Sequence, residues 1–169
     1  EKKYLAAKKF LKKTWTYNSH PELKSSIIKL AEDSQEGVLT VAQYIVSSNS
    51  NEDSTIFLVE VLILEKKWNE ARDKLKTLLD VRPKKEVCLL MAKIEEGENN
   101  NFQKINSWKI RSEKGSANNI WVCTVSNKQQ NEWASVSYSG YFNSLVWKQP
   151  NVLNQIQINI NNNNNNNDN

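Results

Sequence analysis

The chain has 169 residues, which is enough for a hydrophobic core of ordinary size. Its formal net charge is +4 and 25% of its residues are charged, which is too weakly basic to indicate a nucleic-acid partner. No apolar run approaches the roughly 18 residues of a membrane-spanning helix, and no signal peptide is visible. The first residue is Glu1 rather than Met, so we read the sequence as a fragment of a longer protein.

The first predicted element is an amphipathic helix over residues 2–17, in which Tyr4, Ala7, Leu11 and Trp15 recur at helical spacing. The remaining positions are rich in lysine, namely Lys2, Lys3, Lys8, Lys9, Lys12 and Lys13. Such a cluster can contact anionic lipid or an acidic protein, although solvation is its more frequent role. Two further helices, over 23–31 and 39–46, precede a loop of Asn and Ser residues.

The rest of the fold depends on residues 54–83. The run from Ile56 to Leu64 is apolar on every side except Glu60, so this helix must be covered on most sides. Residues 68–79 form an amphipathic helix with one buried stripe. The corner between the two helices is short, so they are expected to lie antiparallel, and Pro83 ends the pair.

This helical pair matches the tetratricopeptide repeat, which is about 34 residues long. Counted from Glu52, Ala71 falls where a small residue lets two helices cross, and Pro83 falls at the closing proline. Thr55 and Val59 replace the usual tryptophan and glycine, so an unrelated helical hairpin remains an alternative. Windows of the same length on either side each hold another hairpin, which predicts a short solenoid.

The third window contains a helix over residues 86–98 with a buried apolar stripe. Gly97 is the expected stop of this helix, because glycine readily adopts the left-handed conformation. A last short helix begins at Phe102 and ends before Gly115.

The character of the chain changes at residue 120. Runs rich in β-branched and aromatic residues predict an antiparallel meander with strands at 120–125, 132–138 and 141–147. Three short strands are marginal alone, so the tryptophans in them are expected to pack on the last helices. These tryptophans are Trp121, Trp133 and Trp147.

Residues 151–169 are of low complexity, with 11 asparagines, and are expected to be disordered; β aggregation is the alternative for such a tract. The expected protein is therefore mainly α, with helical repeats over 1–119 and a Trp-rich meander over 120–150.

The sequence offers no catalytic constellation and no phosphate-binding glycine loop. His20 is the only histidine and follows a helix break, where a local structural role is expected. The acidic group of Glu95, Glu96 and Glu98 suggests either a basic partner or a solvated corner. Cys88 lies in an apolar helical run, which predicts a buried free thiol, and no disulfide framework is visible.

The predicted meander raises the question of a metal. Residues 123–126 and 136–140 resemble the two knuckles of a zinc ribbon. Zinc needs about four thiolate or imidazole ligands, and only Cys123 could serve, because serines stand in the other places. We therefore expect no bound metal and no cofactor.

Several segments together resemble the HemY-type tetratricopeptide proteins of bacterial haem biosynthesis. They are WTYNSHPEL at 15–23, residues 68–72 with 87–96, Trp108, and the Trp…Trp-x-x-Val-Ser…Gly…Trp-x-x-Pro pattern of 120–150. The helical segments are generic to tetratricopeptide proteins, whereas the closing pattern is specific. The chain departs from the family in lacking prolines after Trp133 and after Ser137, and in carrying the asparagine extension.

The resemblance implies an inner-membrane protein whose anchor lies upstream of Glu1, with a cytoplasmic helical domain linked to late haem synthesis and no established catalytic residues. The first hypothesis is therefore a non-enzymatic scaffold that holds protein partners, possible haem-pathway enzymes among them, in a helical groove. Its expected partner-binding residues are Lys24, Lys29, Glu60 and Lys93.

Two other functions stay open. A tetratricopeptide protein with a degenerate zinc ribbon could regulate envelope or lipopolysaccharide assembly. A haem carrier or enzyme would need axial ligands, and His20, Cys88 and Met91 are scattered without a ligand motif.

Overall fold

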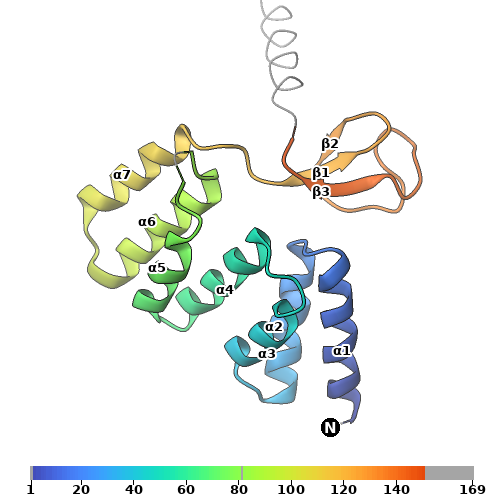
Figure 1. Ribbon diagram of the computed structural model, residues 1–169, viewed down its shortest axis with the longest axis horizontal. Coiled ribbons are helices and arrows are strands. Elements are labelled where there is room, and N and C mark those ends of the chain that lie inside the picture. Colours follow the sequence, from blue (N-terminus) through green and yellow to red (C-terminus); the bar gives the residue numbers. More distant parts are fainter. Residues whose placement is uncertain (1, 81, 151–169) are drawn as a thin grey trace, which may run out of the picture. The chain divides into compact units, whose positions relative to one another are not determined.

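The computed structural model describes residues 2–80 and 82–150, which form two compact units, one ending at Ser116 and the other beginning at Ala117. The protein is mainly helical, with one small antiparallel sheet (Figure 1). Within these residues, no helix combines the length and the apolar character that crossing a bilayer requires. The asparagine-rich tail lies outside the described residues.

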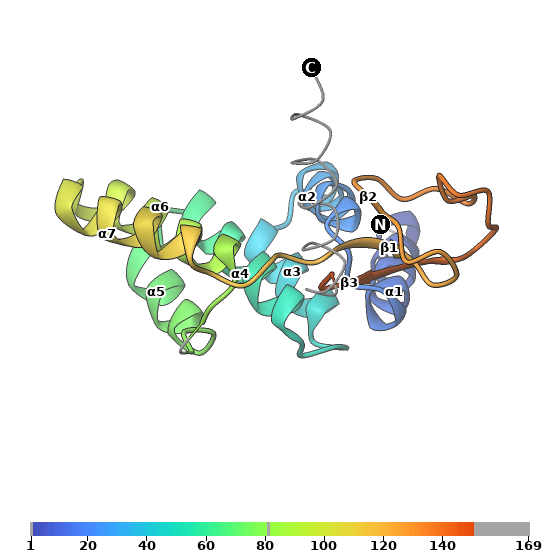
Figure 2. The same ribbon diagram turned by 90° about the horizontal axis from the view of Figure 1, so that it is seen from above.

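The first unit contains seven helices among its described residues. They are α1 (Lys2–Tyr17), α2 (Glu22–Ser34), α3 (Val38–Val46), α4 (Glu52–Leu64), α5 (Trp68–Lys76), α6 (Lys85–Asn99) and α7 (Phe102–Glu113). Each helix packs against the next one in the chain. Helices α1–α3 lie at one end of the unit and α6 and α7 at the other, with α4 and α5 between them (Figures 1 and 2).

Asparagine side chains begin two of these helices. The Asn51 side-chain oxygen accepts a hydrogen bond from the Ser54 N–H at 2.9 Å, and Asn101 accepts one from the Lys104 N–H at 3.1 Å. Each bond satisfies a backbone donor that the first helical turn leaves free. The sequence thus sets the starts of α4 and α7 locally.

The end of α6 differs from the expectation for Gly97, which was wrong. The helix continues to Asn99, and Asn100 is the left-handed residue, with φ of 48°. Gly97 lies within α6 against the indole ring of Trp68, and a β-carbon there would come within 2.3 Å of that ring. The glycine is therefore required by the close approach of α5 and α6, which local sequence does not reveal.

Helix α5 is also shorter than expected. It ends at Lys76, and Leu78 and Leu79 follow it in a turn instead of extending the helix. Both leucines are half-buried and still pack on the core. Leu78 and Leu79 fit the apolar spacing of the helix because they are buried against the core, although they lie outside the helix.

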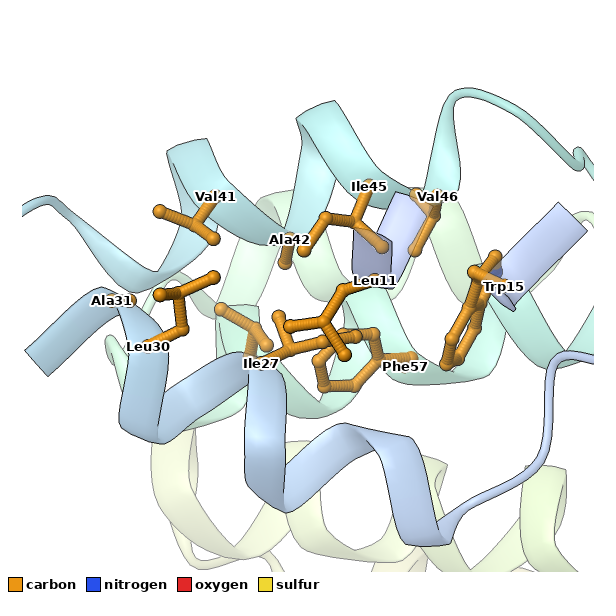
Figure 3. Close-up of a cluster of buried hydrophobic side chains, with 11 residues drawn as sticks. Leu11, Trp15, Ile27, Leu30, Ala31, Val41, Ala42, Ile45, Val46 and Phe57 are labelled. Atoms are coloured by element: carbon orange, nitrogen blue, oxygen red, sulfur yellow. The ribbon is translucent and has the colours of Figure 1, made fainter. Parts of the chain in front are cut away.

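Helix α4 joins two hydrophobic clusters. The first cluster includes Trp15 and Phe57, whose ring centroids lie 5.5 Å apart, and residues of α2 and α3 (Figure 3). The Trp15 Nε1–H donates to the Ser54 hydroxyl at 2.8 Å, so the buried indole is satisfied. The second cluster lies between α4 and the later helices and contains the fully buried Ala71. Helix α4 is covered on most sides, as its all-round apolar sequence predicts.

The second unit contains a sheet of three strands, β1 (Ile120–Cys123), β2 (Gln129–Gln130) and β3 (Leu145–Lys148), in the order β2-β1-β3. Both neighbours run antiparallel to β1. A meander would place the second strand in the centre, so the expected strand order was wrong. The expected strand at 132–138 forms only a single bridge, between Val136 and Phe142.

Turn chemistry explains the difference. Asn127 adopts a left-handed conformation, with φ of 57°, and its N–H donates to the Cys123 carbonyl at 2.9 Å. The chain therefore returns directly after β1, and β2 forms between the strands that were expected at 120–125 and 132–138. The buried Gln130 side chain accepts from the Tyr138 N–H at 3.0 Å and donates to the Glu132 carbonyl at 2.8 Å, which holds the following segment outside the sheet.

The three tryptophans of this unit have different surroundings. Trp121 is fully buried, and its ring lies 5.3 Å from that of Trp147 on the neighbouring strand. Trp133, by contrast, is 49% exposed. Trp121 and Trp147 are directly paired across β1 and β3, so their rings form a cross-strand aromatic contact within this small sheet.

Candidate interaction groove

A groove of about 270 Å³ lies along α2, α4 and α6, which are alternate helices of the first unit. We call it the interaction groove. Its lining residues are Lys24, Ile28, Phe57, Glu60, Val61, Ile63, Leu64, Leu90 and Lys93. No residue of α3 or α5 is among them, so the groove is built from one face of the helical stack.

The floor of the interaction groove is apolar. Phe57 and Val61 are fully buried and Leu90 is 6% exposed, so these side chains are held by the core beneath them. Leu64 stands at the rim and is 66% exposed, which is unusual for a large aliphatic side chain. Rigid apolar side chains under an exposed leucine are suited to holding the apolar side chains of a partner.

Two charged residues of the groove are already paired with each other. The Lys24 ammonium lies 2.6 Å from a Glu60 carboxylate oxygen and 5.9 Å from the centre of the Phe57 ring. This pair joins α2 to α4 across the groove. Lys24 and Glu60 are therefore half-buried and hold the wall of the groove, in contrast to the freely exposed pair that the sequence suggested.

The other two expected residues have separate surroundings. Lys93 lines the groove, is exposed, and makes no ion pair within residues 2–80 and 82–150. Lys29 is exposed on α2 but does not line the groove. The structure thus brings together Lys24, Glu60 and Lys93 and leaves Lys29 outside.

Sequence reasoning did not single out Ile28 and Leu64, the apolar residues at the edge of the groove. Ile28 adjoins the buried Ile27, and Leu64 ends an apolar helix, so both look like ordinary core positions. The only sequence signal for Leu64 is that it is an apolar residue on the last turn of a helix before a corner, and this signal is weak. Which of these residues faces the groove depends on how α2 and α4 pack.

Two of the three acidic residues near the end of α6 are paired within the chain, whereas Glu96 is exposed. Arg72 of α5 forms ion pairs with both Glu95 and Glu98, and Glu95 is 2% exposed. Burial opposes the charge on Arg72, but its hydrogen bonds to both carboxylates raise the pKa of the guanidinium above its usual range. The basic partner that this group suggested is thus Arg72 of the same chain.

A larger hollow, of about 800 Å³, lies between the start of α1 and the end of α2. Its lining mixes the exposed side chains of Tyr4 and Leu5 with an ion pair between Lys8 and Glu36. The hollow has no buried apolar floor comparable to Phe57 and Val61, so size alone does not make it the better binding site. His20 lies elsewhere and is half-buried, and burial lowers the pKa of its imidazole.

The second unit brings together Cys123, Ser126, Ser137, Ser139 and Ser144, which we call the serine–cysteine cluster. The Cys123 thiol is buried, with the Ser126 N–H at 3.4 Å and the Ser144 hydroxyl at 3.3 Å from its sulfur. The Ser126 and Ser139 hydroxyls lie 2.9 Å apart. The two knuckle-like segments seen in the sequence therefore do meet in space.

The cluster is suited to a thiolate. Burial alone would raise the pKa of the Cys123 thiol, but hydrogen bonds from Ser126, Ser144 and Ser137 outweigh it and lower the pKa to about 6. Serine hydroxyls are poor zinc ligands compared with thiolates, so one cysteine and several serines do not make a ribbon-type zinc site. The Ser126 N–H instead donates a hydrogen bond to the sulfur, and the Cys123 thiol donates one to the Ser144 hydroxyl.

Comparison with family models, curated proteins and solved structures finds no match to this chain.

Proposed function

We propose that this chain is a non-enzymatic interaction scaffold that holds a protein segment in the groove along α2, α4 and α6. The observation that supports this proposal is the apolar groove with the exposed Leu64 at its rim, formed by alternate helices. Its volume of about 270 Å³ lies below the roughly 300–1,000 Å³ of small-molecule pockets. A few side chains of a peptide fit such a space better than a complete cofactor.

The finer fold that we propose is a tetratricopeptide-like solenoid. Three features support it: the position of Ala71 in the repeat register, its complete burial, and the lining of one groove by the first helix of each hairpin. Stacked helical hairpins present such grooves on one face. Catalysis is not part of the proposal, because the charged residues of the groove are Lys24, paired with Glu60, and Lys93, without a nucleophile beside them.

The process that we propose is late haem synthesis at the inner membrane of a bacterium, with haem-pathway enzymes as partners. This part rests on the HemY-type pattern of residues 15–23 and 120–150 in the sequence. Membrane association would come from a segment upstream of Glu1, and the unit described here would lie in the cytoplasm.

The test replaces Leu64 with a photo-crosslinking amino acid in the full-length protein, expressed in bacterial cells. A matched control carries the same amino acid at Ile110, which is 58% exposed on α7 and lies outside the groove. We expect cross-links to a haem-pathway enzyme from position 64 and not from position 110. Equal cross-linking from both positions, or no haem-pathway enzyme from position 64, would contradict the proposal.

A second candidate function is the regulation of envelope or lipopolysaccharide assembly by a tetratricopeptide protein with a degenerate ribbon. The convergence of Cys123, Ser126 and Ser139 favours it, because the residues occupy knuckle-like turns without a metal-binding set. The same cross-linking experiment separates the two candidates, since position 64 would then capture an envelope-assembly protein.

A further inference from the structure

The outer face of α1 carries aromatic and basic side chains together. Lys3, Phe10 and Tyr17 are spaced seven residues apart, so they lie along one line of the helix, with Lys13 on the neighbouring line. Phe10 is 69% exposed and Tyr17 is 80% exposed. The opposite side of α1 carries Leu11 and Trp15, which are buried in the first hydrophobic cluster (Figure 3). One face of α1 is thus buried in the core, whereas the side chains of the outer face are exposed.

The structure separates the lysines of α1 into two groups. Lys8 forms an ion pair with Glu36, and Lys12 donates to the Ser47 hydroxyl at 3.0 Å and lies 4.3 Å from the centre of the Tyr44 ring. These lysines hold α1 to the neighbouring helices. The other group comprises Lys3, Lys9 and Lys13, which are exposed and make no ion pair in the described part of the chain.

Within the described residues, neither α1 nor the adjacent α3 places an acidic side chain on the outer face. Helix α1 contains no Asp or Glu, and the adjacent α3 contains no charged residue at all. Asp33 of α2 and Glu36, which follows that helix, line the hollow on the side of α1 that carries Lys8. Positive charge and aromatic rings are therefore concentrated on one exposed strip.

We propose that this outer face of α1 docks onto an anionic lipid surface. Phe10 and Tyr17 enter the headgroup region, where aromatic side chains are favoured, and Lys3, Lys9 and Lys13 contact anionic headgroups. The two exposed rings project from the surface of a single helix, and neither lines the interaction groove or the hollow beside α2. A nucleic acid is disfavoured because the whole chain is only weakly basic, with a net charge of +4.

This contact is separate from the interaction groove and does not depend on the proposed haem pathway. It is a peripheral contact that lies flat on the bilayer, so it neither requires nor replaces a membrane-spanning segment. A face with two large rings and three lysines is expected to bind weakly and reversibly, and to be sensitive to salt.

The test is co-sedimentation of the complete 169-residue chain with lipid vesicles. One vesicle type contains only zwitterionic phosphatidylcholine, and the other contains about 30% anionic phosphatidylglycerol, a composition that gives a negative surface potential. We expect at least tenfold tighter binding to the anionic vesicles. This preference should fall severalfold when the salt concentration rises from roughly 0.1 M to 0.5 M, because screening shortens the range of the attraction.

A matched pair of variants locates the contact. Phe10→Ser with Lys13→Gln removes one ring and one charge from the outer face. Phe102→Ser with Lys109→Gln makes the same chemical changes on α7, where Phe102 is 70% exposed. The α1 variant should lose at least fivefold in affinity for anionic vesicles, while the α7 variant should bind as the unchanged chain does, with both folds verified by circular dichroism.

Three outcomes would overturn the proposal. One is equal binding to both vesicle types, and another is equal loss in the two variants. The third is self-association without lipid that disappears only in the α1 variant, measured by analytical ultracentrifugation. That result would assign the outer face to contact between two copies of the chain.

Discussion

Gly97 of α6 lies directly against the indole ring of Trp68 of α5, with no space for even one additional carbon atom between them. A glycine within a helix normally costs stability, and replacing it with alanine gains roughly 1 kcal/mol. Here the closest approach would be 2.3 Å, which no van der Waals contact tolerates. The packing of the two helices therefore outweighs the local preference for a better helix former.

The first prediction concerns this contact. Gly97→Ala should lower the free energy of unfolding by about 1–3 kcal/mol, because overpacking forces α5 and α6 apart. Trp68→Leu opens the space, so Gly97→Ala should cost much less in that background. Denaturant unfolding of the two single variants and the double variant measures this coupling. Additive losses would show that Gly97 and Trp68 do not interact as described.

The second prediction concerns Ala71, which is fully buried in the cluster between α4 and the later helices. Ala71→Phe should destabilise the protein by about 1–3 kcal/mol through overpacking. Ala6→Phe on the exposed face of α1 is the control and should stay within about 0.5 kcal/mol. An unchanged denaturation midpoint for Ala71→Phe would remove this residue from the helix crossing and weaken the tetratricopeptide register.

The third prediction concerns the pH dependence of Cys123. Its pKa of about 6 in the folded protein lies below that of an unfolded cysteine, about 8.5. The ionised Cys123 thiolate therefore contributes its full share to the free energy of unfolding above the unfolded pKa, and this contribution is lost as the pH falls through 6. In a Cys88→Ala background, thiolate absorbance in the ultraviolet should titrate near pH 6.

The control for this titration is Ser126→Ala, which removes one hydroxyl donor to the sulfur and should move the titration to higher pH. Ser135→Ala changes an exposed serine of the same unit and should leave it unmoved. A Cys123 thiol that titrates near its ordinary value in the unchanged cluster would contradict the hydrogen-bonded arrangement.

The fourth prediction concerns metal. Elemental analysis of the purified protein should find zinc well below one atom per chain, since one thiolate among serines is a poor zinc site. Replacing Ser126, Ser137 and Ser139 by cysteine should create tight binding of a single zinc ion, because these positions surround Cys123. A control with cysteine at the exposed Ser135 in place of Ser137 should bind far more weakly.

Two results would count against this prediction. Stoichiometric zinc in the unchanged protein, lost in Cys123→Ser, would shift the preference to the ribbon-type regulator. Absence of zinc from the three-cysteine variant would show that the four side chains do not converge closely enough to coordinate one ion.

The fifth prediction concerns the charge of the interaction groove. Lys93→Glu reverses the one groove lysine that makes no described ion pair, and it should weaken partner capture from membranes, most strongly at low salt. Lys29→Glu makes the same change on α2 outside the groove and should have no effect. Both variants should stay within about 0.5 kcal/mol of the unchanged stability. Equal capture by all three proteins would remove the groove as the partner site.

The Lys24 and Glu60 pair requires a different variant. Lys24→Glu alone would place two carboxylates together, so lost binding could reflect a distorted groove wall rather than a lost contact. Exchanging the two residues, Lys24→Glu with Glu60→Lys, keeps the pair and reverses its direction. If the exchanged variant captures the partner as well as the unchanged protein does, the Lys24–Glu60 pair has a structural role.

Much of the helical part could be predicted because its signals are local. Apolar spacing at 3.6 residues per turn marks α1 to α7, and the all-round apolar run from Ile56 to Leu64 correctly predicts a central helix. The sheet was harder, because β2 has two residues and its place depends on the left-handed turn at Asn127. Such short strands carry almost no periodic signal.

The sequence by itself determined where the helices lie to within about a turn, which stretches are apolar, and that one cysteine stands among serines in knuckle-like segments. Only the tertiary structure decided that Gly97 serves a helix contact, that Arg72 neutralises Glu95 and Glu98, and that Lys24 is paired while Lys93 is not. The physical reason is that helix formation depends on neighbours within a few residues, whereas these roles depend on distances between segments more than 20 residues apart.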